Sequence, residues 1–208
     1  MSTVSQWLNF SSLHPSILKT LQIKLHKKKP FPHLIIPHFL PEEKALSLLQ
    51  ALTQEHFELK ESDLFTLYQT KDFISSKNKI LRQFRSMLCS TEFLSPLEAI
   101  TNLKLKIHTL DIAGTIYTDT NYLLPHDDQL DNRKIAFIYY LSTLKKSDGG
   151  ALAFYQSKNH EPTTIVKRTQ PTFNTFLLFP VTSTSFHQVE EVLTNTQRIA
   201  ISGWFHGN

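Results

Sequence analysis

Two histidines, an aspartate and an arginine stand out by their types and spacing as residues that could do chemistry. His126 and Asp128 lie in "LLPHDDQLDNRKIAFIYYLS", residues 123–142, directly before one of the most apolar runs in the chain. Side chains of an extended strand alternate between its two faces, so strand parity pairs His126 with Asp128 and turns Asp127 away. This pair alone is a weak signal, because a histidine with acids at the end of a surface strand is common.

His187 adds a third candidate ligand. It lies in "TSFHQV", about sixty residues after His126, and Arg198 follows about ten residues later. Two histidines and one carboxylate on a β scaffold form the facial set that holds Fe(II) and leaves coordination positions open. A 2-oxo acid and O2 would occupy those positions, and the planar guanidinium of Arg198 would bind the distal carboxylate of the acid. The alternative for His187 is a histidine packed in the core.

A β-rich half is needed to position these residues, and the sequence from about residue 105 has that character. Short β-type runs follow one another, separated by turn signals such as "KKSDGG" and "TNTQ". Several short strands at this spacing favour a sandwich or closed barrel of the jelly-roll kind. The predicted runs cover residues 106–117, 121–126, 134–142, 150–156, 163–168, 172–181, 184–189 and 198–206.

The first half of the chain, about 1–104, is predicted to be mainly helical. Spaced apolar positions predict helices over 14–25, 41–57 and 79–101, the last of them broken near Pro96. "FPHLIIPHFL" reads as a strand that its prolines limit to an edge or to short pairing. The expected fold class is therefore α+β: one domain over 1–208, with N-terminal helices packed against a jelly-roll core over about 105–208.

Composition and charge are those of an ordinary globular chain. Of the 208 residues, 40% are hydrophobic and 19% are charged. The single cysteine excludes an intrachain disulfide and favours a reducing compartment. With no leader pattern at the N-terminus and no apolar run near the roughly 20 residues of a membrane span, we expect a soluble cytoplasmic or nuclear protein.

A basic cluster, Lys24 to Lys29, accompanies a net charge of +4. It is compatible with a contact to nucleic acid or to the ribosome. The simpler interpretation is a solvated helix end, where cations favour the negative pole of the helix dipole.

Several segments together resemble a known family. They are "DLFTLYQTKDF" (63–73), the stretch 123–142, "DGGALAFY" (148–155), "FNTFLLFPVTSTSFHQVEEV" (173–192) and "RIAISGWFHG" (198–207). These blocks resemble the Fe(II)- and 2-oxoglutarate-dependent dioxygenases of the prolyl 4-hydroxylase type, most of all the ribosomal prolyl hydroxylases of the Tpa/Ofd group. The resemblance runs from about residue 30 onward and covers the catalytic domain only.

The resemblance implies a double-stranded β-helix and assigns a role to each residue of the site. It implies that His126, Asp128 and His187 are iron ligands and that Arg198 anchors the distal carboxylate of 2-oxoglutarate. The implied cofactors are Fe(II), 2-oxoglutarate as cosubstrate and O2, with ascorbate as an accessory cofactor.

Three aromatic residues also match positions of the family. Tyr117 and Tyr140 match tyrosines that contact 2-oxoglutarate, and Trp204 matches a tryptophan on the substrate side of the pocket. The stretch 63–73 resembles a mobile segment that covers the substrate. For each of the three aromatic residues the alternative is ordinary packing in the core or at an edge.

The implied activity is hydroxylation of a protein substrate, at a proline of a small-subunit ribosomal protein or of another translation component. One alternative is an oxygenase of the same fold with another substrate, such as nucleic acid. No basic groove interleaved with aromatic residues crosses the catalytic half, so a direct nucleic-acid partner is not expected. The other alternative is a non-catalytic, metal-binding jelly-roll module. The sequence does not indicate an oligomeric state.

Overall fold

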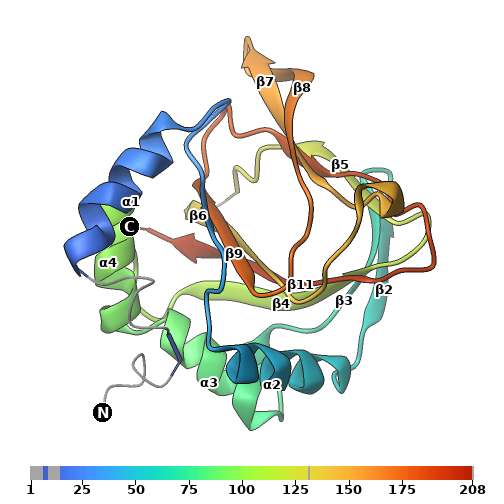
Figure 1. Ribbon diagram of the computed structural model, residues 1–208, viewed down its shortest axis with the longest axis horizontal. Coiled ribbons are helices and arrows are strands. Elements are labelled where there is room, and N and C mark those ends of the chain that lie inside the picture. The colour runs from blue at the N-terminus through green and yellow to red at the C-terminus, as the bar shows by residue number, and fades with distance from the viewer. Residues whose placement is uncertain (1–6, 9–14, 131, 208) are drawn as a thin grey trace.

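An antiparallel sheet of 11 strands curls around a central space in the computed structural model, which describes residues 7–8, 15–130 and 132–207 (Figure 1). The strand order is β1-β9-β6-β11-β4-β3-β5-β10-β7-β8, and β2 pairs with β3 beside this path. The strands are β1 (Leu34–Ile36), β2 (Glu58–Ser62), β3 (Phe65–Gln69), β4 (Leu110–Tyr117), β5 (Tyr122–His126), β6 (Arg133–Tyr140), β7 (Leu152–Lys158), β8 (Glu161–Thr169), β9 (Thr175–Pro180), β10 (His187–Val189) and β11 (Arg198–His206). This is the jelly-roll architecture that the sequence predicts.

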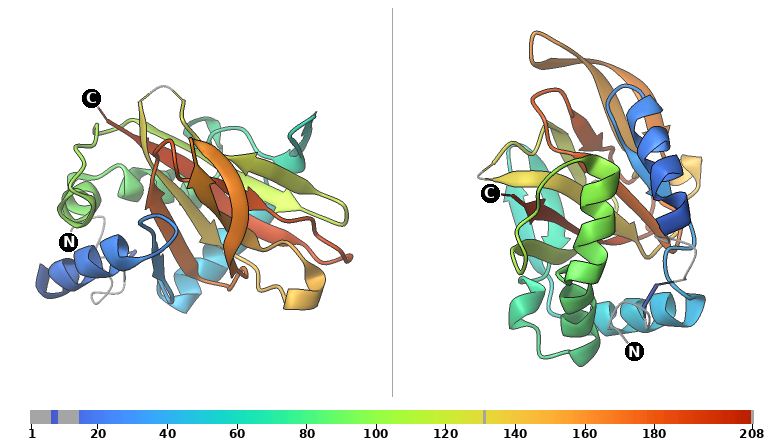
Figure 2. Two further views of the ribbon diagram at one scale, coloured as in Figure 1. Left: turned by 90° about the horizontal axis from the view of Figure 1, so that it is seen from above. Right: turned by 90° about the vertical axis from the view of Figure 1, so that its left-hand side faces the viewer.

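Helices cover one outer face of this sheet (Figures 1 and 2). They are α1 (Pro15–Lys27), α2 (Glu42–Thr53), α3 (Lys79–Leu88) and α4 (Thr91–Thr101), with short 3-10 turns at Phe73–Ser75 and Lys146–Asp148. Helix α1 packs against α4, and α2 packs against α3. Among the described residues, no helix is long and apolar enough to cross a membrane.

The alternation of side chains along β6, β9 and β11 separates two hydrophobic cores. On β11, Ile201 and Phe205 belong to the core beneath the helices, whereas Ala200 and Trp204 belong to the core inside the curled sheet. On β6, Tyr139 and Tyr140 divide in the same way. Because side chains alternate along a strand, one face of the sheet packs against the helices and the other face lines the inside of the curled sheet, where a site can form.

Every predicted strand and helix region has a counterpart, but the division into a helical half and a β half is too sharp. The region 1–104 also contributes β1, β2 and β3. As its prolines suggest, β1 is a short edge strand that pairs with β9 alone. Strand β3 is inserted between β4 and β5, far along the chain. Residue 14, the predicted start of the first helix, lies outside the described residues.

The predicted break near Pro96 is wrong, because the helical region divides at Cys89 and Ser90 instead. Ser90 caps α4, and its hydroxyl accepts a hydrogen bond from the backbone N–H of Phe93 at 3.3 Å. A serine in this position satisfies an N–H that has no partner within the helix. Pro96 lies inside α4, where the helix tolerates the loss of one backbone donor.

Candidate active site

Two neighbouring strands bring the two histidines together. Strands β5 and β10 are antiparallel neighbours, and their register places His187 opposite His126. The ring centroids are 4.2 Å apart. His187 is buried and His126 is partly buried. About sixty residues of sequence separate these side chains, so the fold and not the local chain creates the pair.

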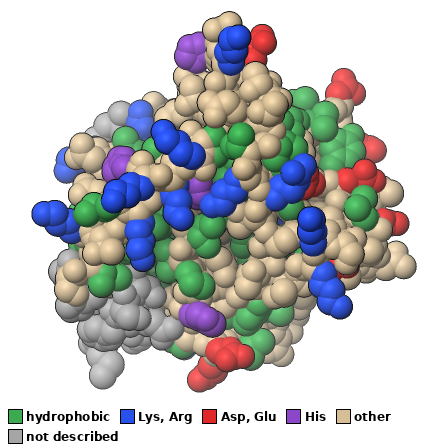
Figure 3. Space-filling model, turned by 45° about the horizontal axis from the view of Figure 1, so that its top comes forward, with side chains coloured by type: hydrophobic (Ala, Val, Ile, Leu, Met, Phe, Trp, Pro, Cys, Tyr) green, Lys and Arg blue, Asp and Glu red, His purple; other side chains and the backbone are tan. Residues whose placement is uncertain are grey.

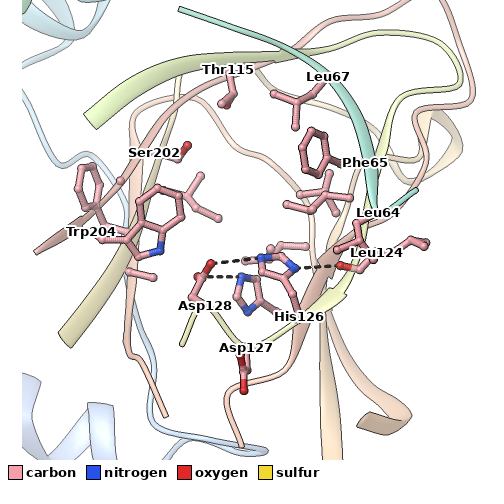
Figure 4. Close-up of a pocket in the computed structure, with 18 of the residues that line it drawn as sticks. Leu64, Phe65, Leu67, Thr115, Leu124, His126, Asp127, Asp128, Ser202 and Trp204 are labelled. Atoms are coloured by element: carbon pink, nitrogen blue, oxygen red, sulfur yellow. Dashed lines mark hydrogen bonds and ion pairs between the residues drawn. The ribbon is translucent and has the colours of Figure 1, made fainter. Parts of the chain in front are cut away.

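Asp128 completes the cluster from a bend and not from a strand. Its Oδ1 lies 3.4 Å from Nε2 of His126, and its Oδ2 lies 3.3 Å from Nε2 of His187 (Figure 4). Strand β5 ends at His126, and Asp128 has a φ of 63°, in the left-handed region that a non-glycine residue rarely adopts. The structure thus brings Asp128 to the histidines, as strand parity predicts, but through a turn of the backbone after β5 and not through the alternation of a strand. A strained backbone conformation of this kind is typical of functional sites.

Backbone carbonyls fix the orientation and the tautomer of both histidines. Nδ1 of His126 is 2.8 Å from the carbonyl oxygen of Leu124, and Nδ1 of His187 is 2.9 Å from that of Ser185. A carbonyl can only accept, so each Nδ1 carries the proton and each neutral ring turns the lone pair of Nε2 toward Asp128. Such a carbonyl partner is typical of metal-binding histidines.

The electrostatics of the cluster favour a cation at its centre. One ligand atom from each of His126, Asp128 and His187 lies within 4.8 Å of the others. Burial by itself raises the pKa of Asp128, but positive charge at the Nε2 atoms of His187 and His126 outweighs burial and holds that pKa well below its ordinary value. With both rings neutral, a metal cation at the same point would supply that charge. Burial lowers the pKa of His126, and the Asp128 carboxylate raises it overall. An ionised carboxylate facing two imidazole lone pairs is a donor set for a divalent metal such as Fe(II).

Asp127 has a different role, as the sequence predicts. Its Oδ1 accepts a hydrogen bond from the backbone N–H of Gln129 at 3.1 Å, and its Oδ2 accepts one from the side-chain amide of Gln129 at 3.2 Å. Figure 4 shows its carboxylate pointing away from the two histidine rings. Asp127 therefore stabilises the bend that places Asp128.

A cavity of about 530 Å³ connects this cluster to Arg198. The residues that line it include His126, Asp128, His187, Arg198 and apolar side chains such as Phe179. Arg198 is 1% exposed, and its Nε donates a hydrogen bond to the carbonyl oxygen of Gly150 at 3.0 Å. Its Nη2 is buried with no partner among the described residues. A buried guanidinium nitrogen without a partner is costly, and the carboxylate of a 2-oxo acid would satisfy it.

Two tyrosine rings hold the Arg198 guanidinium. Its Cζ lies 5.0 Å from the ring centroid of Tyr117 and 5.1 Å from that of Tyr140. Burial raises the pKa of Tyr117 to about 12, and burial also raises the pKa of Tyr140, so both phenols keep their protons and can donate. Tyr117 lines the cavity, whereas Tyr140 contacts Arg198 and does not line it. The buried Tyr140 hydroxyl has no hydrogen-bond partner among the described residues.

The structure brings Trp204 to the cavity and adds a residue that the sequence did not reveal. Trp204 lines the cavity, and the Arg133 guanidinium lies over its ring, with Cζ 3.6 Å from the ring centroid. The pairing of β6 with β11 skips one residue between Ile135 and Arg133. In a regular strand, Arg133 and Ile135 would share the face toward the helices. The bulge turns Arg133 to the other face, beside Trp204.

The segment 63–73 forms one side of the cavity opening. It includes β3, and its residues Leu64, Phe65, Leu67 and Gln69 line the cavity. Leu64 lies in the tight turn from β2 and is 55% exposed. Figure 4 shows Phe65 and Leu67 facing Ser202 and Trp204 across the space above His126. The segment is therefore placed to contact a molecule that enters the site.

A family model matches the part of the chain that carries this site. The model of the 2OG-Fe(II) oxygenase superfamily matches residues 112–206, which include His126, Asp128, His187 and Arg198. The matched part of the chain belongs to the 2OG-Fe(II) oxygenase superfamily. Fe(II) and 2-oxoglutarate are accordingly its cofactor and cosubstrate. The candidate ligand cluster and the unpartnered guanidinium fit these two groups.

Curated relatives of this oxygenase are prolyl hydroxylases by name. Prolyl 3-hydroxylase OGFOD1 of Xenopus laevis is 40% identical over 182 residues, which cover 86% of this chain and 35% of that protein. Prolyl 3,4-dihydroxylase OGFOD1 of Ostreococcus tauri is 32% identical over 197 residues, which cover 85% of this chain and 38% of that protein. The chain thus spans little more than a third of the length of these relatives.

Solved structures confirm the fold of the oxygenase. The crystal structure of a Pseudomonas putida prolyl-4-hydroxylase superposes with a TM-score of 0.73 at 16% identity, covering 92% of this chain and 99% of that one. A Trichoplax adhaerens prolyl hydroxylase, in complex with a peptide fragment of hypoxia inducible factor, gives a TM-score of 0.73 at 17% identity, with coverage of 92% and 89%.

Proposed function

We propose that this oxygenase domain hydroxylates prolyl residues of a protein substrate, with iron held by His126, Asp128 and His187. The observation that carries the ligand assignment is the convergence of two Nε2 lone pairs on an ionised, buried carboxylate. The prolyl substrate is supported by the names of the curated relatives. The overall reaction would convert a prolyl C–H bond, O2 and 2-oxoglutarate into a prolyl C–OH, succinate and CO2.

Each side chain of the site contributes a separate function in this proposal. Bound Fe(II), 2-oxoglutarate and O2 supply the oxidising chemistry. Arg198, in contact with the rings of Tyr117 and Tyr140, binds and orients the distal carboxylate of the cosubstrate. The apolar lining, which includes Leu152 and Phe179, excludes water from the reacting centre. Protein residues thus provide geometry and a dry environment, and the cofactors carry the reaction.

Trp204 and Arg133 are proposed to contact the substrate peptide. The Trp204 indole lines the cavity, and its Nε1 is buried without a hydrogen-bond partner among the described residues. The flat indole suits the ring of a proline, and the Arg133 guanidinium, which also lines the cavity, stacks on that indole. An extended peptide would pass between this pair and the segment 63–73.

We further propose that the substrate is a small-subunit ribosomal protein or another translation component. The support is the resemblance to the ribosomal prolyl hydroxylases in the five blocks between residues 63 and 207. The substrate protein and its proline are the finer part of the proposal, and the experiment below addresses them separately from the chemistry.

Mass spectrometry of candidate substrates tests both parts of the proposal. The purified chain, supplied with Fe(II), 2-oxoglutarate and O2, is incubated with small-subunit ribosomal proteins and translation factors. We expect the mass of one oxygen atom on a prolyl peptide, together with stoichiometric succinate. Asp128→Ala should abolish both, whereas Asp127→Ala should retain most of the activity. Full hydroxylation by Asp128→Ala would contradict the ligand assignment, and hydroxylation only of prolines outside the ribosomal proteins and translation factors would contradict the proposed substrate.

A further inference from the structure

A surface of lysines without acidic partners lies outside the candidate active site. Four exposed lysines, Lys24, Lys27, Lys28 and Lys29, lie in and just after the last turn of α1. Figure 3 shows Lys and Arg side chains spread across the middle of this face, with Asp and Glu side chains mainly toward its edges. None of the four lysines forms an ion pair with a described residue.

The fold adds a fifth lysine from a distant part of the sequence. Lys167 of β8 is half-buried, and its Nζ lies 2.7 Å from Nε2 of the buried His33. Nδ1 of His33 donates to the carbonyl of Phe31 at 2.9 Å, so the neutral ring accepts from the Lys167 ammonium. Burial first, and then the positive charge of Lys28, lowers the pKa of Lys167. Because Lys167 contacts His33, which follows Lys29 by four residues, the fold holds Lys167 beside the segment that carries Lys28 and Lys29. A bound anion would stabilise such a group of cations.

We propose that this lysine surface, formed by Lys24, Lys27, Lys28, Lys29 and Lys167, binds the phosphate backbone of duplex RNA. The proposal goes beyond the oxygenase activity, and the choice of RNA over DNA rests on the proposed translation-linked substrate. It also differs from the expectation drawn from the sequence, in which a solvated helix end is the simpler interpretation. The sequence could not show that a lysine about 140 residues away joins the same surface.

The chemistry of the surface favours contact with phosphates over contact with bases. All five cations are lysines, which suit phosphates as point charges, whereas the neighbouring Arg168 is already paired with Glu190 at 2.8 Å. The rings near these lysines offer bases little to stack on: Phe154, under Lys167, is fully buried, and His26 is a single small ring in the last turn of α1. This favours a duplex, contacted through its phosphates, over a single strand.

A membrane surface fits less well. A helix that lies on a bilayer must present its apolar face to the lipid. Helix α1 packs against α4 instead, and Leu25 of α1 is fully buried in the helix-side core. The exposed apolar side chains near the lysines are scattered singly, such as Ile23 at 45% and Val166 at 52%. Single exposed residues of this kind are ordinary on a protein surface.

Fluorescence anisotropy with a labelled RNA duplex of about 16 base pairs tests the proposal, because that length spans a typical protein footprint on duplex RNA. The titration is carried out on the full chain at several salt concentrations. The test variant is Lys27→Glu/Lys28→Glu/Lys29→Glu, and the matched control is Lys77→Glu/Lys79→Glu/Lys106→Glu, which makes the same charge change at exposed positions outside the lysine surface and outside the segment 63–73. Each phosphate contact contributes about 0.9 to the slope of log K against log salt, so the test variant should lose a slope of about 3 and roughly tenfold or more in affinity.

The outcomes distinguish binding at the lysine surface from a general effect of net charge and from the hydroxylase activity. We expect the control to bind the duplex like the unchanged chain, and both variants to hydroxylate a free prolyl peptide at the original rate. Equal loss of binding in both variants, tighter binding of a DNA duplex of the same sequence, or preference for anionic vesicles or polyglutamate would overturn the proposal. A chain that binds the duplex but hydroxylates no peptide would overturn the proposed function and leave the RNA surface standing.

Discussion

Replacement of Arg198 gives the most direct test of how the cosubstrate is held. The guanidinium is 1% exposed, one nitrogen is used by the Gly150 carbonyl, and Nη2 is left without a partner. A charge-assisted hydrogen bond contributes about 1.5–3 kcal/mol. Without the guanidinium, the cosubstrate carboxylate would also be buried without a partner, which weakens binding further. We therefore expect Arg198→Ala to weaken 2-oxoglutarate binding by about 3 kcal/mol, which corresponds to roughly a 150-fold higher concentration.

Thermal stabilisation by 2-oxoglutarate measures this without turnover. With Mn(II) replacing Fe(II), a cosubstrate concentration 100 times its Kd should stabilise the unchanged chain by about 2.7 kcal/mol and stabilise Arg198→Ala hardly at all. Arg198→Lys should fall between the two, because an ammonium cannot bind a carboxylate in the bidentate mode. Arg168→Ala is the control, since Arg168 is exposed and pairs with Glu190. If Arg198→Ala keeps the full stabilisation, the cosubstrate carboxylate binds elsewhere and the reasoning fails.

Three further predictions follow from the site and its surroundings. Asp128→Asn should lower Fe(II) affinity by roughly 10-fold to 100-fold or more, measured by metal titration under anaerobic conditions, and an equal effect of Asp127→Asn would contradict the assignment. Arg133→Ala should raise the KM for a prolyl peptide roughly threefold to fivefold, through loss of its stacking on Trp204, and leave 2-oxoglutarate binding unchanged; a lower affinity for 2-oxoglutarate would instead point to a general defect. Burial lowers the pKa of His33 to about 4, so the stability that its neutral ring provides is present above pH 6.5 and is lost as the pH falls from 6.5 through about 4. Between pH 7 and pH 4.5, the free energy of unfolding should then fall by about 2.5 kcal/mol more in the unchanged chain than in His33→Gln, measured by chemical unfolding. An equal fall in both proteins would show that His33 does not cause this pH dependence.

The sequence predicts the site better than it predicts the backbone that carries it. His126, Asp128 and His187 follow from residue type and spacing, because few donor sets suit Fe(II). The bend at Asp128 does not follow, since a positive φ at a non-glycine residue depends on the surrounding structure. The amphipathic helices and the alternating strands were predictable because their hydrophobic periods are local properties of the chain.

Pairings between distant segments were beyond the reach of the sequence. Strand β3 was placed in a helical half, because nothing local indicates that it pairs with both β4 and β5. The position of Arg133 beside Trp204 does not follow from the sequence, because a bulge in the pairing of β6 with β11 changes the face of the sheet on which Arg133 lies. Lys167 and His33 likewise meet only after folding. Long-range register is the common cause of these three omissions.

Along strand β11, residues that line the cavity alternate with residues that hold the fold together. Arg198, Ser202 and Trp204 line the cavity from one strand, while Ile201 and Phe205 of the same strand pack beneath the helices. Substitutions at Ser202 or Trp204 therefore reshape the space available to a substrate without opening the helix-side core. Gly203 is the exception, since a Cβ there would meet the backbone oxygen of Asp111. Directed evolution of substrate preference should accordingly accept changes at 202 and 204 and reject them at 203.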